Sequence, residues 1–168
     1  MPSMSETYKL YPAAIASYPM YRGISSILGM EVIPTGNSFS SEVDTLRTHY
    51  GDHDFFYIHY KAADAAGEDG DFEGKVRALE ELDKKIPRLL ELDPEVLVIA
   101  GDHATPAIMA SHSWHNVPLL VRSEWTLGEN VERFSERAFA VGSLGTMPAV
   151  GVMALALAHA GKLAKFGA

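Results

Sequence analysis

The sequence predicts an α/β domain in which a mostly parallel sheet is flanked by helices in three layers. Two observations support this prediction. Helix-like and strand-like patterns alternate along the chain, an order typical of parallel sheets with right-handed crossovers. The run from Val96 to Ala100 is short and wholly apolar, as expected for a central parallel strand covered on both sides. A length of 168 residues suits one domain.

The first half of the chain is expected to alternate between helix and strand. Gly29 is a helix stop, and Gly36-Asn37 is a turn signal. The segment 55–60 is dense in aromatic and β-branched residues, which is typical of a buried strand. The predicted elements are a helix over 13–28 that is interrupted near Pro19, a strand over 31–34, a helix capped by Ser40 or Ser41 and running to about Tyr50, a strand over 55–60, and an acidic loop over 62–71.

The second half contains the most regular helical pattern in the sequence. Apolar residues recur there at spacings of three and four, which places them on one helix face; they are Phe72, Val76, Leu79, Leu82, Ile86 and Leu89. Leu92-Asp93-Pro94 is expected to end this helix. Strands are predicted over 96–100 and 117–121, and a last helix over 147–160. That helix is too short to span a bilayer, so it is expected to lie in the core.

Composition excludes some classes of function. The formal net charge of −8 argues against nucleic acid as a partner, because phosphate backbones select basic surfaces. The chain has no cysteine, so it can form no disulfide or thiolate metal site, and a reducing compartment is favoured. The first dozen residues are polar and show no secretory signal. We therefore expect a cytoplasmic protein with no membrane partner.

Polar residues that could bind metal ions follow three predicted strands or lead into them. In open α/β sheets, ligands bind beyond the carboxyl ends of the strands. Carboxylates together with imidazoles suit manganese, zinc or magnesium-like ions, and two such ions can flank a phosphoryl group. The candidate ligands are Asp64, Glu68, Asp102, His103 and His112.

Each of these residues also has an ordinary structural interpretation. Asp102 could cap the turn that follows its strand, and His112 could be a plain loop histidine like its neighbour His115. The carboxylates of 64–71 could form a solvated acidic loop. The shared placement of the candidates at strand ends is what favours a metal site.

Three motifs resemble a known family. The stretch His59-Tyr-Lys-Ala-Ala-Asp-Ala-Ala-Gly-Glu-Asp-Gly-Asp-Phe-Glu-Gly-Lys75 is similar to a His-x-Lys-x-x-Asp-x-x-Gly-His-Asp-Gly-Asp pattern, and Ala100-Gly-Asp-His-Ala-Thr-Pro106 to an Asp-His-x-Thr-Pro signature. His112 stands six residues before Pro118, as a family histidine does. The segment 8–36 and the tail Lys165-Phe-Gly-Ala168 also fit. Together they resemble the archaeal-type, cofactor-independent (2,3-bisphosphoglycerate-independent) phosphoglycerate mutases of the alkaline phosphatase superfamily.

The resemblance implies a fold, a reaction and a set of site residues. The fold is a parallel sheet flanked by helices, and the reaction interconverts 3-phosphoglycerate and 2-phosphoglycerate through a phosphoserine intermediate. Two divalent ions are implied, manganese first and magnesium or zinc as alternatives. The substrate is a small phosphorylated carboxylate. Asp64, His112 and position 68 would bind the first ion, and Asp102 with His103 the second. Lys61 is expected to contact the substrate; Lys9 and Arg22 are weaker candidates, equally well explained as solvated charges.

Two departures from the family pattern shape the expectation. Position 68 is Glu where the family usually has His; Glu remains a competent ligand, and its charge favours manganese or magnesium over zinc. The chain also resembles only the C-terminal part of the family's phosphatase-like domain. The serine nucleophile, another metal-binding aspartate and the inserted substrate domain have no counterpart here, because no serine lies in a matching motif. The fragment alone is therefore expected to be inactive.

Alternatives to the mutase remain at this stage. A different superfamily member, hydrolysing phosphate monoesters, phosphonates or sulfates, would share the same metal ligands. A non-enzymatic domain could use a vestigial site to bind a metal ion or a protein. A sheet without its N-terminal strands would expose an edge, so self-association is also a reasonable expectation.

Overall fold

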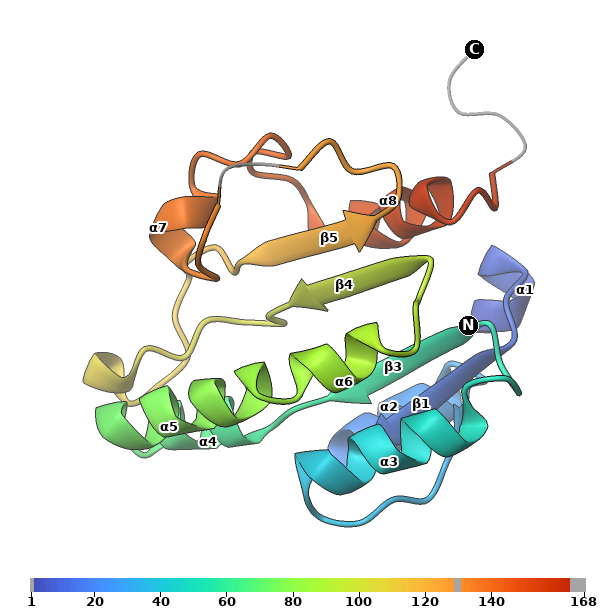
Figure 1. Cartoon of the computed structure of the whole chain (residues 1–168). Helices are drawn as coiled ribbons and strands as arrows, with labels where there is room; N and C mark the ends of the chain where they lie inside the picture. The colour runs from blue at the N-terminus through green and yellow to red at the C-terminus, as the bar shows by residue number, and fades with distance from the viewer. Residues whose placement is uncertain (1, 129–130, 164–168) are drawn as a thin grey trace.

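The computed structural model describes residues 2–128 and 131–163 and confirms the predicted α/β class (Figure 1). The predicted tail match at Lys165–Ala168 lies outside these residues. The elements, in chain order, are α1 (Met4–Tyr8), β1 (Pro12–Ala16), α2 (Pro19–Ile27), β2 (Glu31–Val32), α3 (Phe39–His49), β3 (Phe55–His59), α4 (Ala62–Glu68), α5 (Phe72–Asp83), α6 (Ile86–Leu90), β4 (Val96–Ala100), η1 (Ala107–Met109), β5 (Leu119–Ser123), α7 (Glu136–Phe139), η2 (Ala149–Gly151) and α8 (Val152–His159).

The first sheet is parallel, with strand order β2-β1-β3. Its register pairs Ala13 with Glu31 on one side of β1 and Ile15 with Ile58 on the other. All five residues of β1 are buried. In the view of Figure 1, α3 lies in front of this sheet and α2 behind it. Central position and cover on both faces explain why β1 is apolar throughout.

The predicted helix over 13–28 is wrong in its first part. Residues 12–16 form β1, and the helix begins only at Pro19. Three alanines give this segment a high helix propensity, but propensity is a weak preference that burial in a sheet overrides. Pro19 suits the first turn of a helix, where its missing N–H has no intrahelical acceptor.

The second sheet is a two-stranded antiparallel ladder of β4 and β5, with Val98 opposite Val121. The predicted parallel pairing of Val96–Ala100 is therefore not found among the described residues. The connection between β4 and β5 contains only the three-residue η1, so it has no crossover helix to bring the chain back in parallel. Neither β3 nor β4 pairs with the other. Each leaves one edge unpaired in the described part of the chain, consistent with the expected open edge.

Helix boundaries differ from the sequence prediction at four further places. The predicted loop over 62–71 is mostly α4, because four alanines outweigh its glycine. The predicted helix over 72–89 is two helices, and Pro87 falls in the first turn of the second. The last predicted helix is the short η2 followed by α8. The cap of α3 is Ser38, and Ser41 completes the capping box.

The hydrophobic core joins the first sheet to its helices. Its buried members come from β1, the segment after β2, α3 and α6, and they are Ala13, Ile15, Ile33, Val43, Leu46 and Leu89. This core fixes β1 and β3, whose carboxyl ends lead toward the polar site.

None of the helices in the described ranges is long and apolar enough to cross a membrane.

Shortening a core residue should destabilise the chain far more than the same change at the surface. Ile15 is fully buried, whereas Ile27 on α2 is 72% exposed. We expect Ile15→Ala to lower the free energy of unfolding by about 2–5 kcal/mol, because it leaves a cavity. The matched Ile27→Ala should change it by only about 0.5 kcal/mol. Urea denaturation measures both, and similar losses in the two variants would contradict this core assignment.

Candidate metal centre

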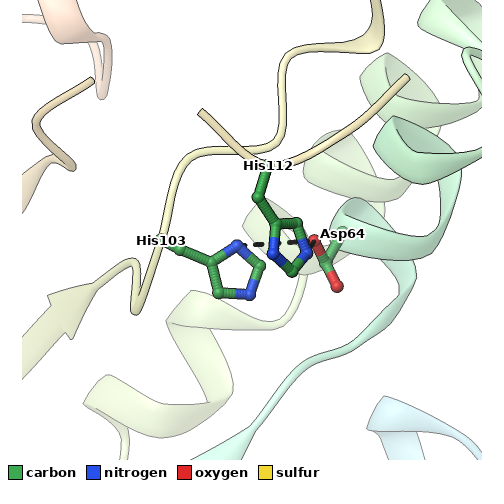
Figure 2. A group of neighbouring side chains, drawn as sticks. All are labelled: Asp64, His103 and His112. Carbon is green, nitrogen blue, oxygen red and sulfur yellow. Dashed lines mark ion pairs between the residues drawn. The ribbon is translucent and has the colours of Figure 1, made fainter. Parts of the chain in front are cut away.

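The candidate ligands approach one another from three segments of the chain. Asp64 lies in the first turn of α4, just after β3, and His103 follows the end of β4. His112 comes from the segment between η1 and β5. Figure 2 shows the two imidazole rings side by side, facing the Asp64 carboxylate. The predicted meeting of these residues at the strand ends is therefore seen in the structure.

Asp64, His103 and His112 form a compact group. One ligand atom from each lies within 4.8 Å of the others. Asp64 Oδ1 is 3.8 Å from both His103 Nδ1 and His112 Nε2, and the two ring centroids are 3.9 Å apart. Oxygen and nitrogen ligands at about 2.1 Å from one ion are roughly 3.0–3.5 Å from each other. Small side-chain rotations would therefore let this group hold a divalent ion.

The remaining two candidates extend the group on either side. Glu68 Oε1 lies 3.4 Å from His112 Nε2, so it is close to the first predicted set. Asp102 Oδ2 lies 3.6 Å from His103 Nε2. The two ring nitrogens of His103 thus face different carboxylates: Nδ1 faces Asp64, and Nε2 faces Asp102. The geometry fits an ion beside Asp64 and accommodates the predicted Asp102–His103 pair.

Lys61 is the cation closest to this acidic group. Its ammonium forms an ion pair with Asp64 and lies 3.0 Å from Glu68 Oε2. The hydrogen bond to Asp64 raises the pKa of Lys61 to about 12. Burial alone would raise the pKa of Asp64, but the hydrogen bonds from Lys61 and Thr105 outweigh it, so that pKa is lowered. At neutral pH the charged Lys61 therefore balances the charged Asp64. A metal ion bound to Asp64 would bring further positive charge to the same place.

Two residues that the sequence analysis did not single out hold the centre together. The hydroxyl of Thr105, which is 4% exposed, donates to Asp64 Oδ1 and lies 3.0 Å from His103 Nδ1. A Cβ at Gly67 would overlap the carbonyl oxygen of Thr105, so only glycine permits this approach of α4. Gly67 lies within the quoted 59–75 motif and Thr105 within the 100–106 motif. Their membership in these motifs was the sequence signal that could have identified them.

Other residues considered from the sequence lie elsewhere or have structural roles. Lys9 donates to the carbonyl of Glu6 at the end of α1. Arg22 is exposed on α2, in a surface hollow next to Gly23. Asp71 caps α5 by accepting from the N–H of Gly74. His115 stacks on the exposed ring of Trp114, so it keeps the ordinary interpretation of a loop histidine.

Comparisons with known proteins show a metalloenzyme family. Residues 1–159 match the family model described as the metalloenzyme superfamily. The chain is 51% identical to proteins named "Probable 2,3-bisphosphoglycerate-independent phosphoglycerate mutase" from Thermotoga petrophila and from Thermus thermophilus. These alignments cover 100% and 99% of the chain and 42% of each relative. The chain thus spans less than half the length of the curated relatives it matches.

Solved structures show the same fold. A protein from Pyrococcus horikoshii superposes with a TM-score of 0.93 at 25% identity, over 99% of this chain and 54% of that one. A cofactor-independent phosphoglycerate mutase from Thermoplasma acidophilum superposes with a TM-score of 0.76 at 23% identity, over 95% of this chain and 39% of that one. The latter likeness supports the fold alone. Both confirm that the α/β class predicted from the sequence is correct.

Removing the lysine that balances Asp64 should strengthen metal binding. In Lys61→Met we expect affinity for Mn²⁺ to rise roughly three- to tenfold, because an ammonium a few ångströms from the ion repels it. Lys84→Met is the matched control, since Lys84 pairs with Glu81 on α5. Isothermal titration calorimetry at constant ionic strength measures both. Weaker Mn²⁺ binding in Lys61→Met would instead mean that the ammonium is needed to assemble the ligands.

Proposed function

We propose that this chain, which belongs to the metalloenzyme superfamily, is the C-terminal, metal-binding part of a phosphoglycerate mutase. The full protein would interconvert 3-phosphoglycerate and 2-phosphoglycerate through a phosphoserine intermediate. The observation that carries the proposal is the convergence of Asp64, His103 and His112 on one point. The names of the curated relatives, at about half identity over the whole chain, support this reaction over others of the superfamily.

The donor set favours hard divalent ions. Carboxylate oxygens and imidazole nitrogens suit manganese, and they also suit magnesium or zinc. Glu68 in place of a neutral histidine adds negative charge, which favours manganese or magnesium over zinc. We propose two ions, one held by Asp64, Glu68 and His112, the other by Asp102 and His103. Bound there, such ions lower the pKa of an attacking hydroxyl and neutralise charge on a phosphoryl group.

Lys61 is the proposed contact to the substrate. Its ammonium is shared between Asp64 and Glu68. Ions bound to these carboxylates would compete for their charge and free the lysine to bind anionic substrate oxygens. A surface hollow next to this lysine is also lined by Lys85, Ser17 and Ser38. Cations and hydroxyls there suit a small phosphorylated carboxylate.

The chain supplies metal ligands but no nucleophile that we can assign. Turnover is therefore proposed for a longer polypeptide, and the chain alone should be inactive. We also propose a cytoplasmic protein without a nucleic-acid or membrane partner, in keeping with its net charge of −8. Its unpaired strand edges make self-association into a homo-oligomer the expected behaviour of the isolated chain.

A second candidate function comes from the same centre. A hydrolase for phosphate monoesters or phosphonates would use the same ligands, so Asp64 or His112 cannot distinguish it from a mutase. A domain that only binds a metal ion or a protein would lack turnover in any context. The product formed by the full-length parent separates these possibilities.

The parent protein should convert 3-phosphoglycerate to 2-phosphoglycerate in an assay coupled to enolase. His112→Ala should lower its turnover about 100-fold or more, because direct ligands matter more than the outer residues whose loss costs 10–100-fold. His115→Ala is the matched control, and its turnover should stay within about twofold of the parent's. Release of inorganic phosphate without 2-phosphoglycerate would contradict the mutase proposal, and equal losses in the two histidine variants would contradict the site.

A further inference from the structure

A tyrosine from the first half of the chain reaches the Asp102 carboxylate. Tyr21 lies near the start of α2, which packs against β1 of the first sheet. Its hydroxyl donates a hydrogen bond to Asp102 Oδ2, across 81 positions of sequence. Asp102 follows β4 of the second sheet, and within residues 2–128 and 131–163 no strand ladder joins the two sheets. This hydrogen bond therefore links α2 directly to the candidate metal centre.

The Tyr21 ring is held in place by residues other than Asp102. It stacks on the ring of His59, at the end of β3, with centroids 3.6 Å apart and planes 21° from parallel. The rings of Tyr18 and Tyr57 lie 6.2 Å and 6.3 Å from it. Such aromatic packing restricts the orientation of the phenol. Packing on α2 and β3 thus sets the direction of the hydroxyl independently of its hydrogen bond to Asp102.

Asp102 has little else to fix its side chain. The side chain is 50% exposed. Oδ1 accepts the backbone N–H of His103 at 3.0 Å, while Oδ2 is the oxygen that lies 3.6 Å from His103 Nε2. Each carboxylate oxygen has two lone pairs. With one lone pair of Oδ2 occupied by the Tyr21 hydroxyl, a second remains available on the same oxygen.

We propose that Tyr21 is a positioning residue whose hydroxyl holds Asp102 so that Oδ2 and His103 Nε2 bind one divalent ion together. This inference rests on the ligand role proposed above for Asp102 and His103. Hydrogen bonds to metal ligands fix ligand orientation, and their loss typically costs 10–100-fold in metal affinity. The loss of metal affinity should fall at the large end of this range, because only Asp102 and His103 are assigned to this ion.

The phenol also differs in charge from the group that holds the other carboxylate. Asp64 is paired with the ammonium of Lys61, and a cation in that position repels an incoming metal ion. Tyr21 is a neutral donor, so it can orient Asp102 without that repulsion. Removing the two groups should therefore have opposite effects: loss of Lys61 strengthens metal binding, and loss of the Tyr21 hydroxyl weakens it.

Electron paramagnetic resonance of free Mn²⁺, followed to millimolar concentration, can test this role in the 168-residue chain. We expect a modest binding event at the Asp64 set and a weaker one at Asp102–His103. Tyr21→Phe should raise the dissociation constant of the weaker event about tenfold or more and leave the stronger one unchanged. Tyr57→Phe, the same chemical change within the aromatic cluster, should alter neither. Asp102→Asn should abolish the weaker event, and Tyr21→Phe should have no further effect in that background.

The outcomes separate the two levels of the proposal. If Asp102→Asn abolishes the weaker event but Tyr21→Phe leaves it unchanged, Tyr21 is not a positioning residue and the ligand role stands. If wild type shows no second event, or Asp102→Asn does not affect it, the ligand role fails and this inference fails with it. If Tyr21→Phe weakens both events together and lowers the metal-free unfolding midpoint, the hydroxyl has only a structural role, and the proposal is overturned.

Discussion

The hydrogen bond from Thr105 to Asp64 joins the two halves of the candidate metal centre. Asp64 belongs to the segment after β3, and Thr105 to the segment after β4. These strands lie in two sheets that do not pair with each other in the described part of the chain. The bond forms only because Gly67 lets α4 come against the Thr105 backbone. Lys75 of α5 holds the same segment by donating to the Thr105 carbonyl. The position of His103 relative to Asp64 depends on this contact.

Charge balance is the second constraint on the centre. Three carboxylates, those of Asp64, Glu68 and Asp102, lie around the imidazoles of His103 and His112, and Lys61 pairs with two of these carboxylates. Such a cluster is costly to gather unless cations compensate it. Lys61 compensates the charge of Asp64 and Glu68, and the phenol of Tyr21 orients Asp102. A divalent ion would supply the remaining positive charge, so the residues fit the metal chemistry of the superfamily to which the chain belongs.

Much of the site could be predicted from the sequence, but less of its surroundings. The strands at 55–60 and 96–100 were predicted nearly to the residue, because dense apolar runs depend little on context. The helix prediction over 13–28 was wrong in its first part, because burial of β1 in a sheet overrides the helix propensity of alanine. Such burial is a tertiary effect that local sequence does not show. The antiparallel pairing of β4 was missed because it depends on the connection to β5, which contains η1 but no crossover helix. Tyr21 carried no sequence signal, since its role arises from a contact 81 residues away.

The central claim is that a metal ion binds to Asp64 and His112, with Glu68 completing the proposed set and His103 close beside it. Anomalous diffraction at the manganese edge, from crystals of the chain grown with Mn²⁺, would locate the ion directly. We predict its strongest peak within about 2.0–2.4 Å of Asp64 and His112. A peak held only by surface carboxylates elsewhere, with Asp64 still paired with Lys61, would contradict the claim.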